Sequence, residues 1–170
     1  MFSDCHFIYG ICTTALAHAS VSKTPTYLYR VSIETELNFL KKFLKIQVPG
    51  KSIVTLNPRF TSSVLGVSHL DDVGYLFKNI TTPEIVPNTI EDTSVRRFVK
   101  LWTNFAKIGN PIPGQNDPLL PTVWKPVTNE NLDFLDIGRD LVPRRNPYPD
   151  RMKFWKQLFA ESPAGQGKPT

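Results

Sequence analysis

The chain has 170 residues, enough for one domain with a buried core, and its 41% apolar and 11% aromatic content excludes a largely disordered protein. The formal net charge of +5 includes isolated basic pairs, Lys41-Lys42, Arg96-Arg97 and Arg144-Arg145, without a basic stripe interleaved with aromatics. We interpret these pairs as solvated surface and expect no nucleic-acid partner.

The first element in chain order, between residues 3 and 19, allows two interpretations. The apolar run from Phe7 to Cys12, followed by Ala17-His18-Ala19, is similar to the core and cleavage site of a secretory leader. However, the residues before it contain no Lys or Arg and include an acid, which favours an amphipathic helix capped by Ser3 or Asp4. We expect the helix, with these side chains buried: Phe7, Ile8, Ile11, Cys12 and Ala15. No other stretch approaches a membrane span.

The two cysteines, Cys5 and Cys12, are seven residues apart. On a helix this spacing separates them by about 10 Å along the axis, which is too far for a disulfide. His6 and His18 do not stand at the ligand spacing of a zinc site. We therefore expect no disulfide, no bound metal and no cofactor.

A strand is predicted over residues 27–33, which are rich in aromatic and β-branched side chains. Its apolar residues stand at both odd and even positions, whose side chains point to opposite faces, and this indicates a strand covered on both faces. Residues 36–45 favour a helix with Leu37, Leu40 and Leu44 on one side, and residues 47–65 are expected to be irregular.

Residues 66–72 form a predicted loop, and residues 73–77 a short ordered element. Pro83 and Pro87 indicate another connection over residues 81–88. A helix is predicted over residues 93–108, because these positions follow helical spacing and share one apolar face: Val95, Phe98, Val99, Trp102, Phe105 and Ala106. Asp92 or Thr93 would cap it, and Gly109 followed by Pro111 would end it.

Toward the end of the chain, residues 132–137 are predicted to form an edge strand with one polar side. A last amphipathic helix is expected over residues 150–159, with these side chains buried: Met152, Trp155, Leu158 and Phe159. Residues 161–170 are rich in small residues, Pro and Gly, and are expected to be a disordered tail.

By spacing alone, the candidate site is His69 with Asp71 and Asp72. A histidine can transfer protons near neutral pH, and neighbouring carboxylates can orient it. A solvated acidic turn explains the same residues. The chain contains no Gly-x-Ser-x-Gly, and Ser68 lacks the flanking glycines of a nucleophile elbow.

Several segments in one order resemble the type-B carboxylesterase family, closest to insect members of the antennal and detoxifying kinds. The resemblance covers about residues 2–160. It includes Thr26-Tyr27-Leu28-Tyr29-Arg30-Val31-Ser32, Gly66-Val67-Ser68-His69-Leu70-Asp71-Asp72-Val73-Gly74-Tyr75-Leu76-Phe77, the run from Phe98 to Pro111 ending Phe105-Ala106-Lys107-Ile108-Gly109-Asn110-Pro111, Trp124-Lys125-Pro126, Leu135-Asp136-Ile137 and Phe154-Trp155.

The resemblance implies an α/β fold, in which residues 1–160 form the C-terminal portion of an α/β-hydrolase domain. This portion would contain late strands of the sheet and the helices that pack on them, so the domain would be incomplete in these residues. In that family the triad runs serine, acid, histidine along the chain. His69 stands where the family has its histidine, which acts as general base and then general acid. Asp72 matches an acidic position that we expect to support the histidine loop. Leu70 departs from the small residue often found there.

The implied function is hydrolysis of a small-molecule carboxylic ester by a Ser-His-acid triad in a longer parent protein. The serine and acid lie outside this chain, so we expect the isolated chain to be inactive. The alternative is a non-catalytic, cholinesterase-like adhesion protein of the neuroligin or neurotactin type. Localisation is undecided, although Asn79-Ile80-Thr81 is a glycosylation sequon that secretion would make usable.

Overall fold

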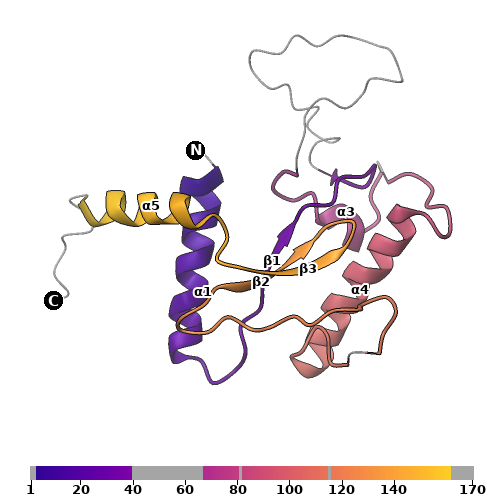
Figure 1. Cartoon of the computed structure of the whole chain (residues 1–170). Coiled ribbons are helices and arrows are strands. Elements are labelled where there is room, and N and C mark those ends of the chain that lie inside the picture. The colour runs from indigo at the N-terminus through magenta and orange to yellow at the C-terminus, as the bar shows by residue number, and fades with distance from the viewer. Residues whose placement is uncertain (1–2, 40–66, 81, 115, 162–170) are drawn as a thin grey trace, which may run out of the picture. The chain divides into compact units, whose positions relative to one another are not determined.

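The computed structural model describes residues 3–39, 67–80, 82–114 and 116–161. In chain order, the elements are the π-helical turn η1 (Asp4–Ile8), α1 (Tyr9–Val21), β1 (Leu28–Val31), α3 (Val73–Leu76), α4 (Ile90–Ile108), β2 (Asp133–Ile137), β3 (Leu141–Arg145) and α5 (Pro149–Glu161). Figure 1 labels all of them except η1. The irregular stretch, the tail after residue 161 and most of the helix predicted over 36–45 lie outside the described residues. Within the described ranges, no helix combines the length and the apolar character that crossing a bilayer requires.

The three strands form one sheet in the order β1-β2-β3. The strand predicted over residues 132–137 is therefore real, but it is the middle strand of this sheet, and the prediction of an edge position is wrong. Its second neighbour, β3, was not predicted from the sequence. β3 contains Pro143, and a proline is tolerated on a strand with a free edge because its missing N–H removes no needed ladder bond.

The chain divides into two compact units, which are described separately. The first comprises Met1–Arg30, Val123–Leu135 and Val142–Thr170. Its core is a cluster of apolar side chains from α1, the strands and the connection between α4 and β2: Cys12, Ala15, Leu28, Val127, Leu132 and Phe134. Trp124 is buried beside this cluster and donates a hydrogen bond from Nε1 to the carbonyl of Leu28, at 3.0 Å.

The predicted N-terminal helix is confirmed, whereas the predicted buried face is only partly right. Cys12 and Ala15 are buried, but Phe7 is 42% exposed and Ile11 52% exposed. Cys5 and Cys12 carry free thiols in this structure, and burial raises the pKa of Cys12. On β1 only Leu28 is buried, so the expectation of a strand covered on both faces is wrong for the described chain.

The buried Asp4 forms an ion pair with the partly exposed Arg151 and does not cap the helix. Its carboxylate accepts hydrogen bonds from Nε of Arg151 in α5, at 3.0 Å, and from a terminal guanidinium nitrogen of the same side chain. The hydrogen bond from Arg151 holds the pKa of Asp4 below its usual value. In α5 itself Trp155 is buried, while Leu158 and Phe159 are 45% and 39% exposed rather than buried as predicted.

The second unit comprises Val31–Thr122 and Asp136–Leu141. Its main helix, α4, starts earlier than predicted, because Thr89 is the cap and accepts a hydrogen bond from the Asp92 N–H at 3.3 Å. It ends as predicted at Gly109, whose left-handed φ of 69° suits a glycine.

The buried face of α4 differs from the predicted stripe. Ser94, Phe98 and Leu101 are buried, whereas Val99 and Phe105 are exposed. The Phe98 ring stacks on Tyr75 of α3, with centroids 4.9 Å apart. This contact packs the short helix α3, which follows the histidine loop, against α4.

Candidate active site

His69 is at the tip of a tight turn that spans Ser68 to Asp71. The Asp71 N–H donates to the Ser68 carbonyl at 3.2 Å, which makes His69 and Leu70 the two central residues. The turn is closed a second time, because the Ser68 N–H donates to Oδ2 of Asp71 at 2.8 Å. His69 is exposed at this tip. The loop predicted over residues 66–72 is thus confirmed for the described residues 67–72.

Leu70 has a φ of 68°, in the left-handed region that favours glycine. A turn with positive φ at its second central residue usually has Gly or Asn there. A leucine in this conformation costs about 1–2 kcal/mol of backbone energy. The strain persists because the residues on either side of the tip are fixed by two hydrogen bonds.

The base of the turn is a buried carboxylate. Asp71 has a relative exposure of 0%. A buried charge is stable only when hydrogen bonds replace its water. Here Oδ2 accepts from Nδ2 of Asn38, at 3.1 Å, in addition to the Ser68 N–H. Asn38 is itself 2% exposed, so this contact is shielded from solvent.

Asn38 is oriented unambiguously by its neighbours. Oδ1 accepts from the Thr35 N–H at 2.7 Å, and a backbone N–H can only donate, so the atom facing it is the oxygen. The amide nitrogen therefore faces the Ile33 carbonyl, at 3.3 Å, and Asp71. Asn38 thus connects the chain just after β1 to the base of the histidine turn.

Tyr75 of α3 completes the network. Its hydroxyl donates to Oδ1 of Asn38 at 2.9 Å and lies 2.8 Å from the Thr35 hydroxyl. Burial raises the pKa of Tyr75 to about 12, so its phenol remains a hydrogen-bond donor at neutral pH. We call Thr35, Asn38, Asp71 and Tyr75 the Asn38 network. All four belong to the second unit.

Asp72, which we predicted to support the histidine loop, is partly buried. It precedes α3 as its N-cap residue, without a side-chain capping bond. Its supporting role stays a prediction. Asp71 is the carboxylate at the centre of the described network, whereas the sequence resemblance singled out its neighbour Asp72.

Ser68 leaves one polar atom unsatisfied. Its hydroxyl oxygen is buried and has no hydrogen-bond partner among the residues that the structure describes. Leaving a buried hydroxyl unpaired costs about 1–3 kcal/mol. This atom belongs to the residue that directly precedes His69 in the chain.

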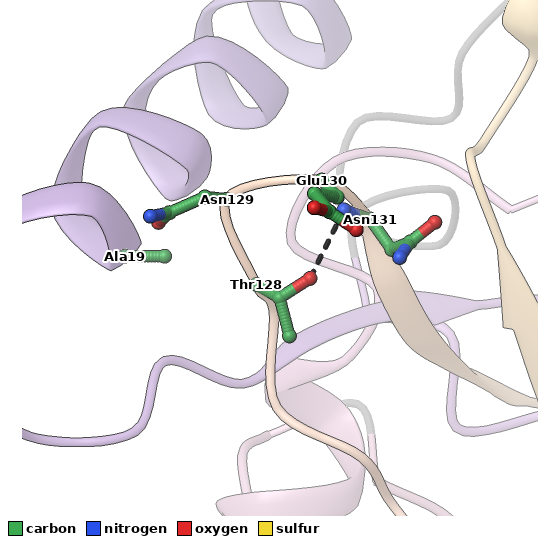
Figure 2. Close-up of a pocket in the computed structure, with 5 residues that line it drawn as sticks. All are labelled: Ala19, Thr128, Asn129, Glu130 and Asn131. Carbon is green, nitrogen blue, oxygen red and sulfur yellow. Dashed lines mark hydrogen bonds between the residues drawn. The ribbon is translucent and has the colours of Figure 1, made fainter.

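Two hollows occur elsewhere in the described chain. Figure 2 shows the first, of about 520 Å³, where the end of α1 at Ala19 faces the polar turn 128–131. Within this turn the Asn131 N–H donates to the Thr128 hydroxyl, at 3.1 Å. The second, of about 290 Å³, lies between α3, residues 82–85 and Val95 of α4. His69 lines neither hollow, and the described residues contain no His, Cys, Asp and Glu cluster suited to a metal ion.

Comparison with known proteins gives one consistent match. The model of the carboxylesterase family matches residues 1–155. Bile salt-activated lipase from Rattus norvegicus is 35% identical over 111 residues, which are 62% of this chain and 18% of the relative. Juvenile hormone esterase from Tribolium castaneum is 32% identical over 119 residues, which are 68% of this chain and 18% of the relative.

Among solved structures, juvenile hormone esterase from Manduca sexta superposes with a TM-score of 0.63 at 20% identity. The match covers 92% of this chain and 27% of that protein. At this identity it shows the fold alone, which is part of an α/β-hydrolase. The chain spans about a fifth to a quarter of the length of these relatives.

Proposed function

Because the chain belongs to the carboxylesterase family, we propose that it supplies the general base, His69, of a serine carboxylesterase. In this proposal the nucleophilic serine and the triad acid come from a part of the protein outside these 170 residues. The complete protein hydrolyses a small-molecule carboxylic ester. The chain alone does not, because its histidine has no nucleophile to activate.

One observation carries the proposal: His69 is solvent-accessible at a turn whose base is buried and hydrogen-bonded. A general base has to reach the reacting hydroxyl within hydrogen-bond distance and keep that position. An exposed tip on a fixed base meets both needs. A solvated acidic turn would not require a fully buried Asp71 at its base.

The chemistry assigned to His69 has two proton transfers in each half of the reaction. The imidazole takes the serine proton as the serine oxygen bonds to the ester carbonyl carbon. It then gives this proton to the departing alcohol as the carbon–oxygen bond breaks. Water repeats the sequence on the acyl-enzyme: the imidazole takes a proton from water and returns it to the serine oxygen.

The test requires the complete protein, encoded by the full transcript. Hydrolysis of p-nitrophenyl acetate is measured for wild type, His69→Ala and the control His18→Ala. His18 is an exposed histidine that contacts Thr26. Removing a general base costs about 10²- to 10⁴-fold in rate, so His69→Ala is expected to lose activity to this extent and His18→Ala to keep it.

Three results would contradict the proposal. Full activity of His69→Ala in the complete protein would remove the general-base role. Turnover by the purified 170-residue chain, abolished by His69→Ala, would contradict the need for a separate nucleophile. A complete transcript without a serine in a Gly-x-Ser-x-Gly elbow would instead favour the adhesion class.

A further inference from the structure

We propose that Asp71 and Asn38 are positioning residues for His69, fixing the turn that presents the imidazole without touching substrate themselves. This inference rests on the proposed function, in which His69 is the general base. It assigns the supporting carboxylate to Asp71, on the evidence of its burial and its hydrogen bonds.

The first step of the argument is that Asp71 closes the turn from both sides. Its N–H donates to the Ser68 carbonyl and its carboxylate accepts from the Ser68 N–H. His69 and Leu70 lie between these two bonds, so movement of either flank changes where the imidazole points. A carboxylate acceptor makes the second bond charge-assisted and hence stronger than a neutral one.

The second step is that Asn38 holds Asp71 in place from a different part of the chain. Its amide nitrogen contacts the same Oδ2 that accepts from Ser68. Its oxygen is fixed by the Thr35 N–H and by Tyr75 of α3. Asn38 is therefore a fixed hydrogen-bond partner of Asp71, and it keeps the Asp71 carboxylate oriented toward the Ser68 N–H.

The third step is that the turn would not keep this shape by itself. Leu70 has a φ of 68°, which leucine disfavours. Local backbone strain persists where surrounding structure overrides it. The Asn38 network provides that override, so weakening it relaxes the turn and displaces His69. A displacement of about 1 Å from productive geometry can reduce a rate about 10²-fold.

The experiment compares Asp71→Ala and Asp71→Asn with Ser94→Ala in the complete protein. Ser94 is a matched control, because it is buried in the same unit and its hydroxyl donates to the Ile90 carbonyl at 2.6 Å. Both kcat and KM are measured well below each variant's melting temperature. The expected result is a fall in kcat of about 10- to 100-fold for Asp71→Ala, with KM unchanged within about twofold. Asp71→Asn, which keeps an acceptor for Ser68, recovers part of that loss, and Ser94→Ala keeps wild-type kcat.

A purely structural role for Asp71 predicts a different pattern. The variants would then lose melting temperature while keeping kcat, as Ser94→Ala does, and this outcome would overturn the inference. If Asp71→Ala does not fold, the Tyr75→Phe variant tests the positioning role instead, because it removes only the hydroxyl that contacts Asn38. A kcat loss of about fivefold supports the inference, by the same displacement argument, and wild-type kcat overturns it.

The His69→Ala variant, assayed in the same series, separates the two proposals. Inactive His69→Ala with fully active Asp71→Ala refutes the positioning role and leaves the general-base role intact. Fully active His69→Ala refutes both, because no base remains to be positioned.

Discussion

Replacing Gly74 by alanine is expected to break hydrogen bonds of the Asn38 network, which hold the turn that carries His69. Gly74 is buried in α3, and a Cβ added there would lie 1.8 Å from the Leu37 carbonyl oxygen and 3.0 Å from its carbon. Both are backbone atoms, so no side-chain rotation relieves the clash. The α3 backbone and residue 37 have to separate by about 1 Å or more.

The magnitude follows from what is attached to Leu37. Asn38 is the next residue, so the shift breaks its bond to Asp71, a charged acceptor worth about 1.5–3 kcal/mol, and its bond to Tyr75, worth about 0.5–1.5 kcal/mol. Alanine returns at most about 1 kcal/mol of helix propensity. The net loss of local stability is therefore about 1–3.5 kcal/mol, which corresponds to roughly 5- to 400-fold faster amide exchange.

Hydrogen exchange followed by mass spectrometry measures this loss in peptides that cover residues 67–80. Gly10→Ala is the matched control: Gly10 lies in α1, and an added Cβ there meets nothing within 4 Å. We expect Gly10→Ala to leave exchange in these peptides unchanged. Wild-type protection of residues 67–80 in Gly74→Ala would refute the reasoning.

Three further predictions concern unfolding of the complete protein by denaturant. Gly109→Ala should cost about 1–2 kcal/mol from its φ of 69° alone, since no atom lies within 4 Å of the new Cβ, and an unchanged midpoint would contradict this. Arg151→Met should destabilise most at neutral pH. The pKa of Asp4 is lowered by Arg151, so the pair's contribution is present above the ordinary Asp pKa of about 4 and lost as pH falls further. Equal losses at pH 7 and pH 3 would argue against the ion pair. Ser68→Ala should not lower stability, because it removes a buried hydroxyl without a partner among the described residues; a loss above about 1 kcal/mol would reveal a partner elsewhere.

The α4 helix shows which part of the fold sequence patterns predict. Its existence and its end at Gly109 follow from local signals, and both are confirmed. Its start was missed although Thr89 and Asp92 form a box-like cap, in which Asp92 also accepts from the Asn88 N–H. Its buried face was predicted only in part: Phe98 was included and stacks on Tyr75, whereas Ser94 and Leu101 were not included. Which other positions are buried depends on the packing of distant segments, which helical spacing alone does not contain.

The candidate site, too, could be predicted from the sequence only in part. The motif around His69 was recognisable, because it is contiguous in the chain. Asp71 and Asp72 are equivalent in a local pattern, and the residue that distinguishes them, Asn38, is 33 positions away. The sequence did contain one local sign of the strained turn. Leu70 occupies a position that is often a small residue in the family, and the structure gives it a φ of 68°.

The network partners described for the histidine turn all come from residues 33–75. His69 and the Asn38 network are therefore encoded on one continuous stretch of the sequence. Recombination between related esterases that exchanges this whole stretch transfers the histidine together with the residues that hold its turn. A crossover between Asn38 and Asp71 separates the two, and such chimeras should be enriched among inactive recombinants.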